Sequence, residues 1–229
     1  MRKEHESIMI VNFKTYSEAS GTKALALSKI LEDVQRETGI QVIVAAQTTD
    51  LFPLSQHVEI PVYAQHVDPQ PQGGHTGHIA PEAVKESGAR GTLLNHSERR
   101  LELATLEECV RRTGVVGLTS VVCANNVATA AACAAFEPDI VAVEPPELIG
   151  TGRAVSKAKP EVVTDAVARI RDISKKVVIL CGAGISEAHD ASSALNLGAQ
   201  GILVSSAVVK ATDQRKVALD MAREMSRFT

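Results

Sequence analysis

Short apolar runs rich in β-branched residues recur along the whole chain. Runs of this length, bounded by polar or turn-forming residues, predict buried parallel strands. The predicted strands cover residues 8–11, 42–45, 62–64, 92–94, 119–122, 140–143, 177–180 and 202–204. Between them, apolar residues recur every three or four positions, the period of an amphipathic helix, most clearly over 24–34, 162–170 and 217–225.

Strand and helix alternate along the chain, and no Pro/Ser-rich linker or block of charge divides it. Eightfold alternation of this kind predicts one domain over residues 1–229 with an α/β fold, the single-domain (β/α)₈ barrel. An open doubly wound sheet is the alternative, and it would place a G-x-G-x-x-G turn after the first strand. That position holds Asn12-Phe13-Lys14-Thr15, so the barrel is favoured.

Charge and hydropathy narrow the possible partners. The 229 residues carry a net charge of −3, which gives no long-range attraction to nucleic acid or anionic lipid. The segment 1–6 lacks the apolar centre of a signal peptide, and no stretch approaches the roughly 20 apolar residues of a membrane span. We therefore expect a cytoplasmic protein with no nucleic-acid partner and no membrane partner.

The cysteines and histidines show no metal-binding pattern. Cys109, Cys123, Cys133 and Cys181 lack C-x-x-C spacing and lie in apolar or helical surroundings, which indicates reduced structural thiols. His75 and His78 are close in sequence, but no strong third ligand follows at a useful spacing. We expect no metal site and no cofactor.

Reactive side chains follow several of the predicted strands, and the active site of a barrel forms at the carboxyl ends of its strands. Asn12 and Lys14 follow the first strand and, being two residues apart, project to the same side of extended chain. Glu144 ends the sixth strand, immediately before two prolines. Each of these residues alone is more simply explained as a polar residue at a strand end, so the argument depends on their convergence.

His96 lies in the segment 95–100, which follows the fourth strand. Ser97 or Asn95 is a suitable helix cap, so we expect a helix to begin here and to leave His96 at its amino terminus. The helix dipole there disfavours the imidazolium, which favours a neutral imidazole that donates a hydrogen bond. A histidine that is merely bonded to backbone is the alternative.

Small residues follow the last two strands. The segments 181–186 and 205–208 offer glycine or serine, exposed backbone N–H groups and a helix start. Such turns suit a phosphate dianion, and barrels frequently place a phosphate site at these two loops. Either loop alone is equally well explained as ordinary turn chemistry. Residues 150–152 add a flexible, donor-rich stretch after the sixth strand.

In order and spacing, these motifs resemble those of the triosephosphate isomerase family. They are Asn12-x-Lys14, the segment 95–100, Glu144-Pro145 with residues 149–152, and the paired small residues after the last two strands. The chain is shorter than the common form, has Pro146-Glu147-Leu148 where that form has a tryptophan, and ends its last strand in Ser205-Ser206 in place of two glycines. It therefore resembles the compact archaeal branch of the family.

The resemblance implies a TIM barrel and an isomerase of glycolysis and gluconeogenesis that acts on small-molecule triose phosphates. The reaction would interconvert dihydroxyacetone phosphate and D-glyceraldehyde 3-phosphate through an enediolate. Lys14, His96 and Glu144 would be the catalytic residues, and Asn12 and Lys14 would contact the substrate. The positions whose backbone would hold the substrate phosphate are Ile149, Gly150, Gly184, Ser205 and Ser206.

In this reaction Glu144 would be the base, and closure of the loop 145–155 over it would remove water and raise its proton affinity. His96 would donate to the developing oxyanions, and Lys14 would supply fixed positive charge. Glu98 is expected to support Lys14 by pairing with its ammonium. A surface pair between Glu98 and a neighbouring arginine is the alternative.

The segment 65–78 is a long loop for a compact barrel, and loops of this length are usually functional or disordered. In the family the matching loop inserts into a partner subunit beside the catalytic lysine, so a homodimer is expected, with Thr76 near the tip of the loop. The alanine-rich segment 127–136 predicts a helix with almost no polar face. A homotetramer that uses this helix is the further possibility.

Two other interpretations remain open. One is a different phosphate-binding barrel enzyme, such as a sugar-phosphate epimerase, which gives no reason for the combination of Lys14, His96 and Glu144-Pro145. The other is a barrel that binds a sugar phosphate as a sensor or scaffold. Such a protein would not exchange the carbon-bound hydrogen of its ligand with solvent, whereas an isomerase must.

Overall fold

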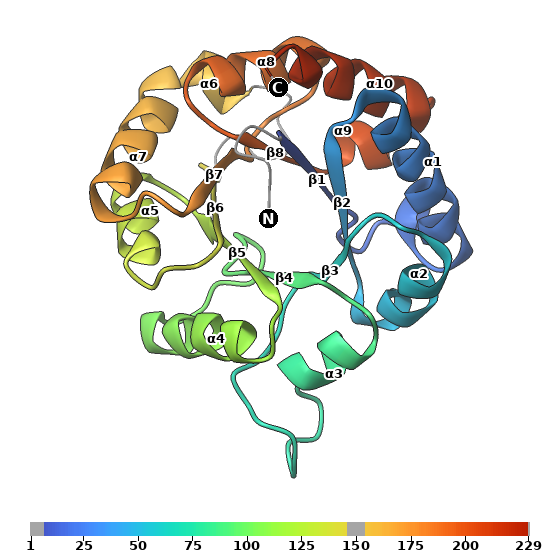
Figure 1. The fold of residues 1–229 in the computed structure, drawn as a ribbon, viewed down its shortest axis with the longest axis vertical. Coiled ribbons are helices and arrows are strands. Elements are labelled where there is room, and N and C mark those ends of the chain that lie inside the picture. Colours follow the sequence, from blue (N-terminus) through green and yellow to red (C-terminus); the bar gives the residue numbers. More distant parts are fainter. Residues whose placement is uncertain (1–6, 146–153, 229) are drawn as a thin grey trace.

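The computed structural model describes residues 7–145 and 154–228. Eight strands in these residues close into a barrel in sequence order, each parallel to both of its neighbours (Figure 1). They are β1 (Ile8–Asn12), β2 (Gln41–Ala46), β3 (Val62–Ala64), β4 (Gly91–Leu94), β5 (Thr119–Ala124), β6 (Ile140–Val143), β7 (Val178–Cys181) and β8 (Gly201–Val204). The predicted barrel and all eight predicted strands are confirmed, with ends that differ by no more than two residues.

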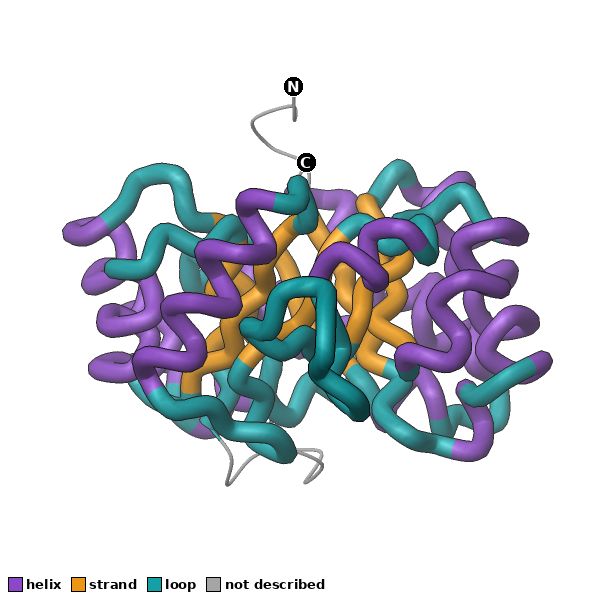
Figure 2. The backbone as a smooth tube through the Cα atoms, turned by 90° about the horizontal axis from the view of Figure 1, so that it is seen from below, coloured by secondary structure: helices purple, strands orange, loops and turns teal. Residues whose placement is uncertain are grey.

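Helices surround the barrel on its outer side (Figures 1 and 2). They are α1 (Thr22–Thr38), α2 (Leu51–His57), α3 (Pro81–Glu86), α4 (Leu103–Val115), α5 (Val127–Ala134), α6 (Val155–Ala158), α7 (Pro160–Ile173), α8 (Ala188–Asn196), α9 (Ser206–Val209) and α10 (Gln214–Met225). The three helices predicted from periodicity correspond to α1, α7 and α10. No helix in the described parts of the chain has the length and hydropathy needed to cross a membrane.

Burial on both faces explains why the strands read as continuous apolar runs. Along β1, Ile8 and Ile10 pack inside the barrel, whereas Met9 and Val11 pack outward among the residues that contact the helices. The inner cluster is filled by one set of alternating side chains and the outer cluster by the other, as expected for a barrel that is a packed core and not a pore. The carboxyl ends of the strands are then the natural place for polar groups.

Candidate active site

Lys14 is held in an unusual backbone conformation just beyond the end of β1. Its φ is 47°, which is uncommon for a residue with a side chain. The Oδ1 atom of Asn12 accepts the Lys14 backbone N–H at 2.9 Å, and Gln65 Nε2 donates to the Lys14 carbonyl at 2.8 Å. The Lys14 Nζ atom lies 2.8 Å from Glu98 Oε1, so of the two pairings considered for Glu98 the structure has the one with Lys14.

The segment after β4 does not begin a helix, and that prediction is wrong. Asn95 has a φ of 58°, its Nδ2 atom donates to the carbonyl of Cys123 at 3.0 Å, and its Oδ1 atom accepts the N–H of Leu101 at 2.9 Å. These bonds commit the Asn95 side chain to bridging two neighbouring segments and leave it unable to cap a helix. Residues 96–99 form a turn instead, and α4 begins only at Leu103.

The hydrogen bonds of His96 define its tautomer. The backbone N–H of Glu98 donates to His96 Nδ1 at 3.3 Å, while the Glu98 carboxylate is farther away at 3.5 Å. A ring nitrogen that accepts an N–H bond carries no proton, so the proton of the imidazole is on Nε2. The Nε2–H donor is therefore assigned from this local bond, since no helix begins at His96 as the sequence suggested.

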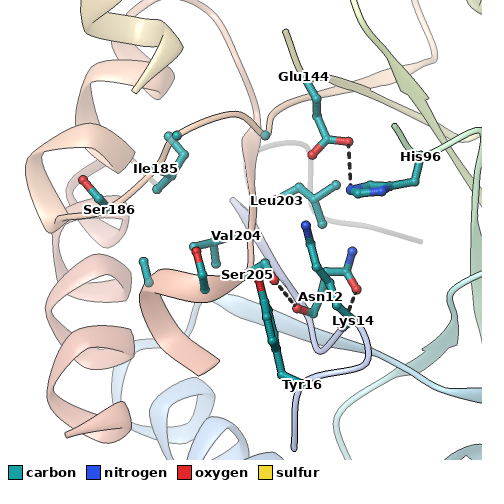
Figure 3. A pocket seen from close by; sticks show the side chains of 14 residues that line it. Asn12, Lys14, Tyr16, His96, Glu144, Ile185, Ser186, Leu203, Val204 and Ser205 are labelled. Carbon is teal, nitrogen blue, oxygen red and sulfur yellow. Dashed lines mark hydrogen bonds and ion pairs between the residues drawn. The ribbon is translucent and has the colours of Figure 1, made fainter. Parts of the chain in front are cut away.

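Glu144 follows β6, where its backbone N–H donates to the carbonyl of Ala124 at 2.7 Å. Its side chain is only 5% exposed, and Oε2 lies 3.8 Å from His96 Nε2 (Figure 3). No hydrogen-bond partner for this oxygen exists among the described residues. A buried carboxylate oxygen without a donor is available to accept a proton from a ligand.

The three side chains lie in one cavity. Lys14, His96 and Glu144, which come from the ends of β1, β4 and β6, line a hollow of about 230 Å³ at the carboxyl ends of the strands (Figure 3). Asn12, Gly184, Ser205 and Ser206 line the same cavity. These seven residues, which the sequence analysis selected from distant parts of the chain, therefore line one cavity in the structure.

The loops after β7 and β8 form one side of this cavity. Ser205 Oγ donates to the Asn12 carbonyl at 2.7 Å and so joins the end of β8 to the end of β1. The short helix α9 begins at the next residue, Ser206. Ile149, Gly150 and most of the loop 145–155 lie outside the described residues. No cluster of three or more His, Cys, Asp or Glu side chains that could hold a metal ion occurs within residues 7–145 and 154–228.

Comparison with known proteins gives the family of this chain. The family model described as triosephosphate isomerase matches residues 7–223. The chain belongs to the triosephosphate isomerase family. It is 50% identical over 218 residues to the triosephosphate isomerase of Methanothermus fervidus, covering 95% of this chain and 98% of that one, and 52% identical over 209 residues to that of Archaeoglobus fulgidus, covering 91% and 94%.

The structural comparison supports the same fold at greater distance. The crystal structure of triosephosphate isomerase from Bartonella henselae superposes with a TM-score of 0.78 at 17% identity, covering 96% of this chain and 98% of that chain. The archaeal relatives have nearly the same length as this chain, which confirms the compact branch. The chain is thus an isomerase that interconverts dihydroxyacetone phosphate and D-glyceraldehyde 3-phosphate, a step of glycolysis and gluconeogenesis.

One residue of this triosephosphate isomerase site was missed by sequence reasoning. Gly182 follows β7 directly beside Glu144, and a Cβ atom on it would lie 2.5 Å from Glu144 Cγ and 2.9 Å from Oε1. The glutamate side chain therefore occupies space that only glycine leaves open. No sequence signal separates this glycine from an ordinary turn glycine, because the contact joins residues from different strands.

The four cysteines are buried and free, as predicted. Burial raises the pKa of Cys109 and Cys181 to about 12 and that of Cys133 to about 11. Burial, with the nearby Glu144 carboxylate, also raises the pKa of Cys123 well above its ordinary value. These thiols are therefore protonated at neutral pH and take no direct part in chemistry.

Proposed function

We propose that Glu144 is the base of the isomerase reaction, His96 the proton donor to the substrate oxygens, and Lys14 the fixed positive charge beside them. The observation that carries this proposal is the convergence of the three side chains on one cavity, with the carboxylate and the imidazole 3.8 Å apart. A gap of this size leaves the carboxylate and the ring free to act on different atoms of a bound substrate.

The reaction removes a proton from a weakly acidic carbon, so it needs a base and a group that stabilises the enediolate oxygens. The Glu144 oxygen that has no described hydrogen-bond partner suits the first task. The Nε2–H of His96, which faces that carboxylate, suits the second because a neutral imidazole can donate to one oxygen and recover the proton from the other.

Lys14 stabilises negative charge only if its ammonium stays in place. The ion pair with Glu98, at 2.8 Å, and the two backbone bonds of Lys14 restrict its motion. Its side chain is 11% exposed, so little water competes for the charge. The structure thus supports a fixed cation at the edge of the cavity, with Glu98 as its support and Asn12 as a second substrate contact.

We further propose that the substrate phosphate binds between Gly184 and the pair Ser205 and Ser206. The first N–H groups of a helix have no intrahelical partner, and α9 begins beside the cavity. The Ser205 hydroxyl already donates to the Asn12 carbonyl, so at Ser205 the backbone is the donor that remains for an anion.

A coupled isomerase assay and a crystal structure with a phosphate-bearing enediolate analogue test these assignments together. We expect the phosphate against Gly184, Ser205 and Ser206, and the reacting carbons between Glu144 and His96. An analogue whose phosphate lies elsewhere would remove the phosphate assignment. A protein that binds the analogue but turns over no triose phosphate would be a sensor or scaffold.

We also propose that the segment 65–78 mediates a homodimer. It extends beyond the ring of helices between β3 and α3 (Figure 1). Its base is pinned, because Asp68 accepts the N–H of Ile79 at 2.7 Å and donates its own N–H to the Ile79 carbonyl at 2.9 Å. A second hollow of about 460 Å³, lined by Lys14 and Gln65 among others, lies beside this base and is a suitable receptor for the loop of a partner.

Sedimentation of the wild-type protein and of Thr76→Arg at micromolar concentration tests the dimer. We expect a dimeric wild type and a dissociated variant of lower activity, and a wild type that is monomeric would exclude the interface. A homotetramer would need a second surface, for which the exposed Ala128 and Ala132 on α5 are the candidates. Sedimentation that shows only dimers would exclude the homotetramer.

We propose finally that residues 1–229 form one domain and that the protein acts in the cytoplasm. The barrel and its helices extend over most of the chain, with β1 beside β8. Four free, buried thiols suit a reducing compartment.

A further inference from the structure

Asp190 is a buried carboxylate that the proposed mechanism does not use. It lies in the first turn of α8 and is 1% exposed. Its Oδ2 atom accepts three bonds from the preceding loop: from the backbone N–H of Ser186 at 2.9 Å, from the Ser186 hydroxyl at 3.0 Å, and from the backbone N–H of Glu187 at 3.0 Å. Burying a charge is costly unless it is hydrogen-bonded, so these bonds strongly constrain the loop.

The same carboxylate closes the amino terminus of α8 against a ligand. Glu187 and Asp190 form a reciprocal capping box, in which each side chain accepts the backbone N–H of the other. Two carboxylates of the chain therefore occupy the end of the helix that would otherwise attract an anion. The backbone N–H groups at this helix end are therefore already bonded, and a carboxylate is not a ligand for a phosphate dianion.

The loop that Asp190 holds is nevertheless part of the active-site cavity. Gly184, Ile185 and Ser186 line the cavity, whereas Asp190 does not. Gly184 has a φ of 72°, a left-handed conformation that turns the chain sharply. The bonds to Asp190 fix the chain immediately after that turn, so they determine where the backbone of Gly184 faces.

Asp190 also contacts the segment that leads into α7. The hydroxyl of Ser156, on α6, donates to the Asp190 backbone carbonyl at 3.4 Å, and Ser156 is itself buried. The first turn of α8 is thus a common support for the loop after β7 and for α6.

We propose that Asp190 is a positioning residue for phosphate recognition. By holding the backbone N–H and the hydroxyl of Ser186, it orients the backbone of Gly184 and Ile185 toward the phosphate without touching the substrate, and it thereby governs the part of catalysis that depends on phosphate binding. This inference rests on the proposed role of Gly184 at the phosphate. A residue that only stabilises the fold would affect every substrate equally.

The chain contains a matched control for this role. Asp139 Oδ2 accepts the backbone N–H of Ser120 at 2.8 Å and the Ser120 hydroxyl at 3.0 Å, the same pair of bonds that Ser186 makes to Asp190. Asp139 immediately precedes β6 and so lies at the opposite end of the barrel from the cavity. Asp139 is exposed whereas Asp190 is buried, so Asp139→Asn controls for the loss of these two carboxylate–serine bonds and leaves the loop after β7 unchanged.

The test compares Asp190→Asn, Asp139→Asn and the wild type in three measurements. These are kcat/KM for D-glyceraldehyde 3-phosphate, the rate with D-glyceraldehyde, which lacks the phosphate, and the inhibition constant of inorganic phosphate. For Asp190→Asn we expect kcat/KM for D-glyceraldehyde 3-phosphate to fall about tenfold and the rate with D-glyceraldehyde to stay unchanged. The inhibition constant of inorganic phosphate should rise about tenfold, because misplaced donors bind the dianion less well. Asp139→Asn should leave all three unchanged.

Equal losses with the phosphorylated and the unphosphorylated substrate, or an unchanged phosphate inhibition constant, would overturn the proposal. If the wild type itself shows no inhibition by phosphate, the phosphate assignment fails and not the role of Asp190 alone. Should Asp190→Asn fail to fold, Asp190→Ser retains a hydroxyl acceptor in the same turn. The same split between the two substrates is expected for it, and its absence would count equally against the proposal.

Discussion

Substituting Gly182 by alanine should displace the proposed base without removing it. The added Cβ would lie 2.5 Å from Glu144 Cγ and 2.9 Å from its Oε1 atom. Ordinary carbon–carbon contacts are about 3.5–4.0 Å, so the glutamate side chain must retreat by about 1 Å. A misplacement of about 1 Å costs a catalytic group on the order of 100-fold in rate. We therefore expect kcat to fall about 100-fold in Gly182→Ala.

The coupled isomerase assay measures this loss, and inorganic phosphate inhibition measures whether the cavity still binds an anion. Gly114→Ala is the control: it lies in α4, away from the cavity, and an added Cβ there meets no atom within 4 Å. That variant should keep full activity and gain roughly 0.5–1 kcal/mol in free energy of unfolding, since alanine favours a helix. A Gly182→Ala enzyme whose kcat stays within threefold of the wild type would refute the reasoning.

Further outcomes follow from the site and the core. Lys14→Ala should lower kcat by about 10²–10³-fold and also raise KM, because the charge serves both substrate and transition state; an unchanged KM would argue against a substrate contact. Glu98→Gln should lower kcat less, by about tenfold, because Lys14 keeps its charge and loses only its ion-pair partner. The control Glu108→Gln, which breaks an exposed pair with Arg111, should have no effect on kcat. Equal effects of the two variants would contradict the supporting role of Glu98. Burial raises the pKa of Cys109, Cys133 and Cys181 to about 11–12, so these thiols keep their protons in the folded state at a pH where the unfolded chain loses them. Their contribution to stability is complete below about pH 9 and is lost as pH rises toward 11–12. The free energy of unfolding should therefore fall over this range by up to about 1.4 kcal/mol per pH unit per thiol. Urea unfolding of Cys133→Ala should show a shallower fall than the wild type, and equal slopes would contradict the assigned burial effect.

The barrel was predictable because its strands are buried on both faces, and a continuous β-branched run is a local signal. The position of Glu144 at the end of such a run follows from the same signal. His96 was placed correctly, but the helix expected around it was wrong, since the Asn95 side chain bonds to Cys123 on β5 and to Leu101 instead of capping. An asparagine can cap a helix or bond to a neighbouring strand with the same side-chain atoms, so the sequence alone does not distinguish the two roles of Asn95.

The roles of Gly182 and Asp190 were not predictable from the sequence, because each depends on contacts with other segments of the chain. The importance of Gly182 arises from a side chain on the neighbouring strand, and that of Asp190 from a cavity that it supports but does not line. Each depends on packing between segments that are distant in sequence or on the direction of a loop. Such dependence leaves no periodicity or motif at the residue itself.

Exchange of carbon-bound hydrogen with solvent tests the central claim most directly. In deuterated water the wild-type enzyme should place deuterium at the reacting carbons of the recovered triose phosphate, because the base releases its proton to solvent during the enediolate stage. Glu144→Gln should abolish this incorporation while inorganic phosphate still binds with nearly the wild-type inhibition constant. Near-complete deuterium incorporation by Glu144→Gln would contradict the account, since some other group would then be removing the proton.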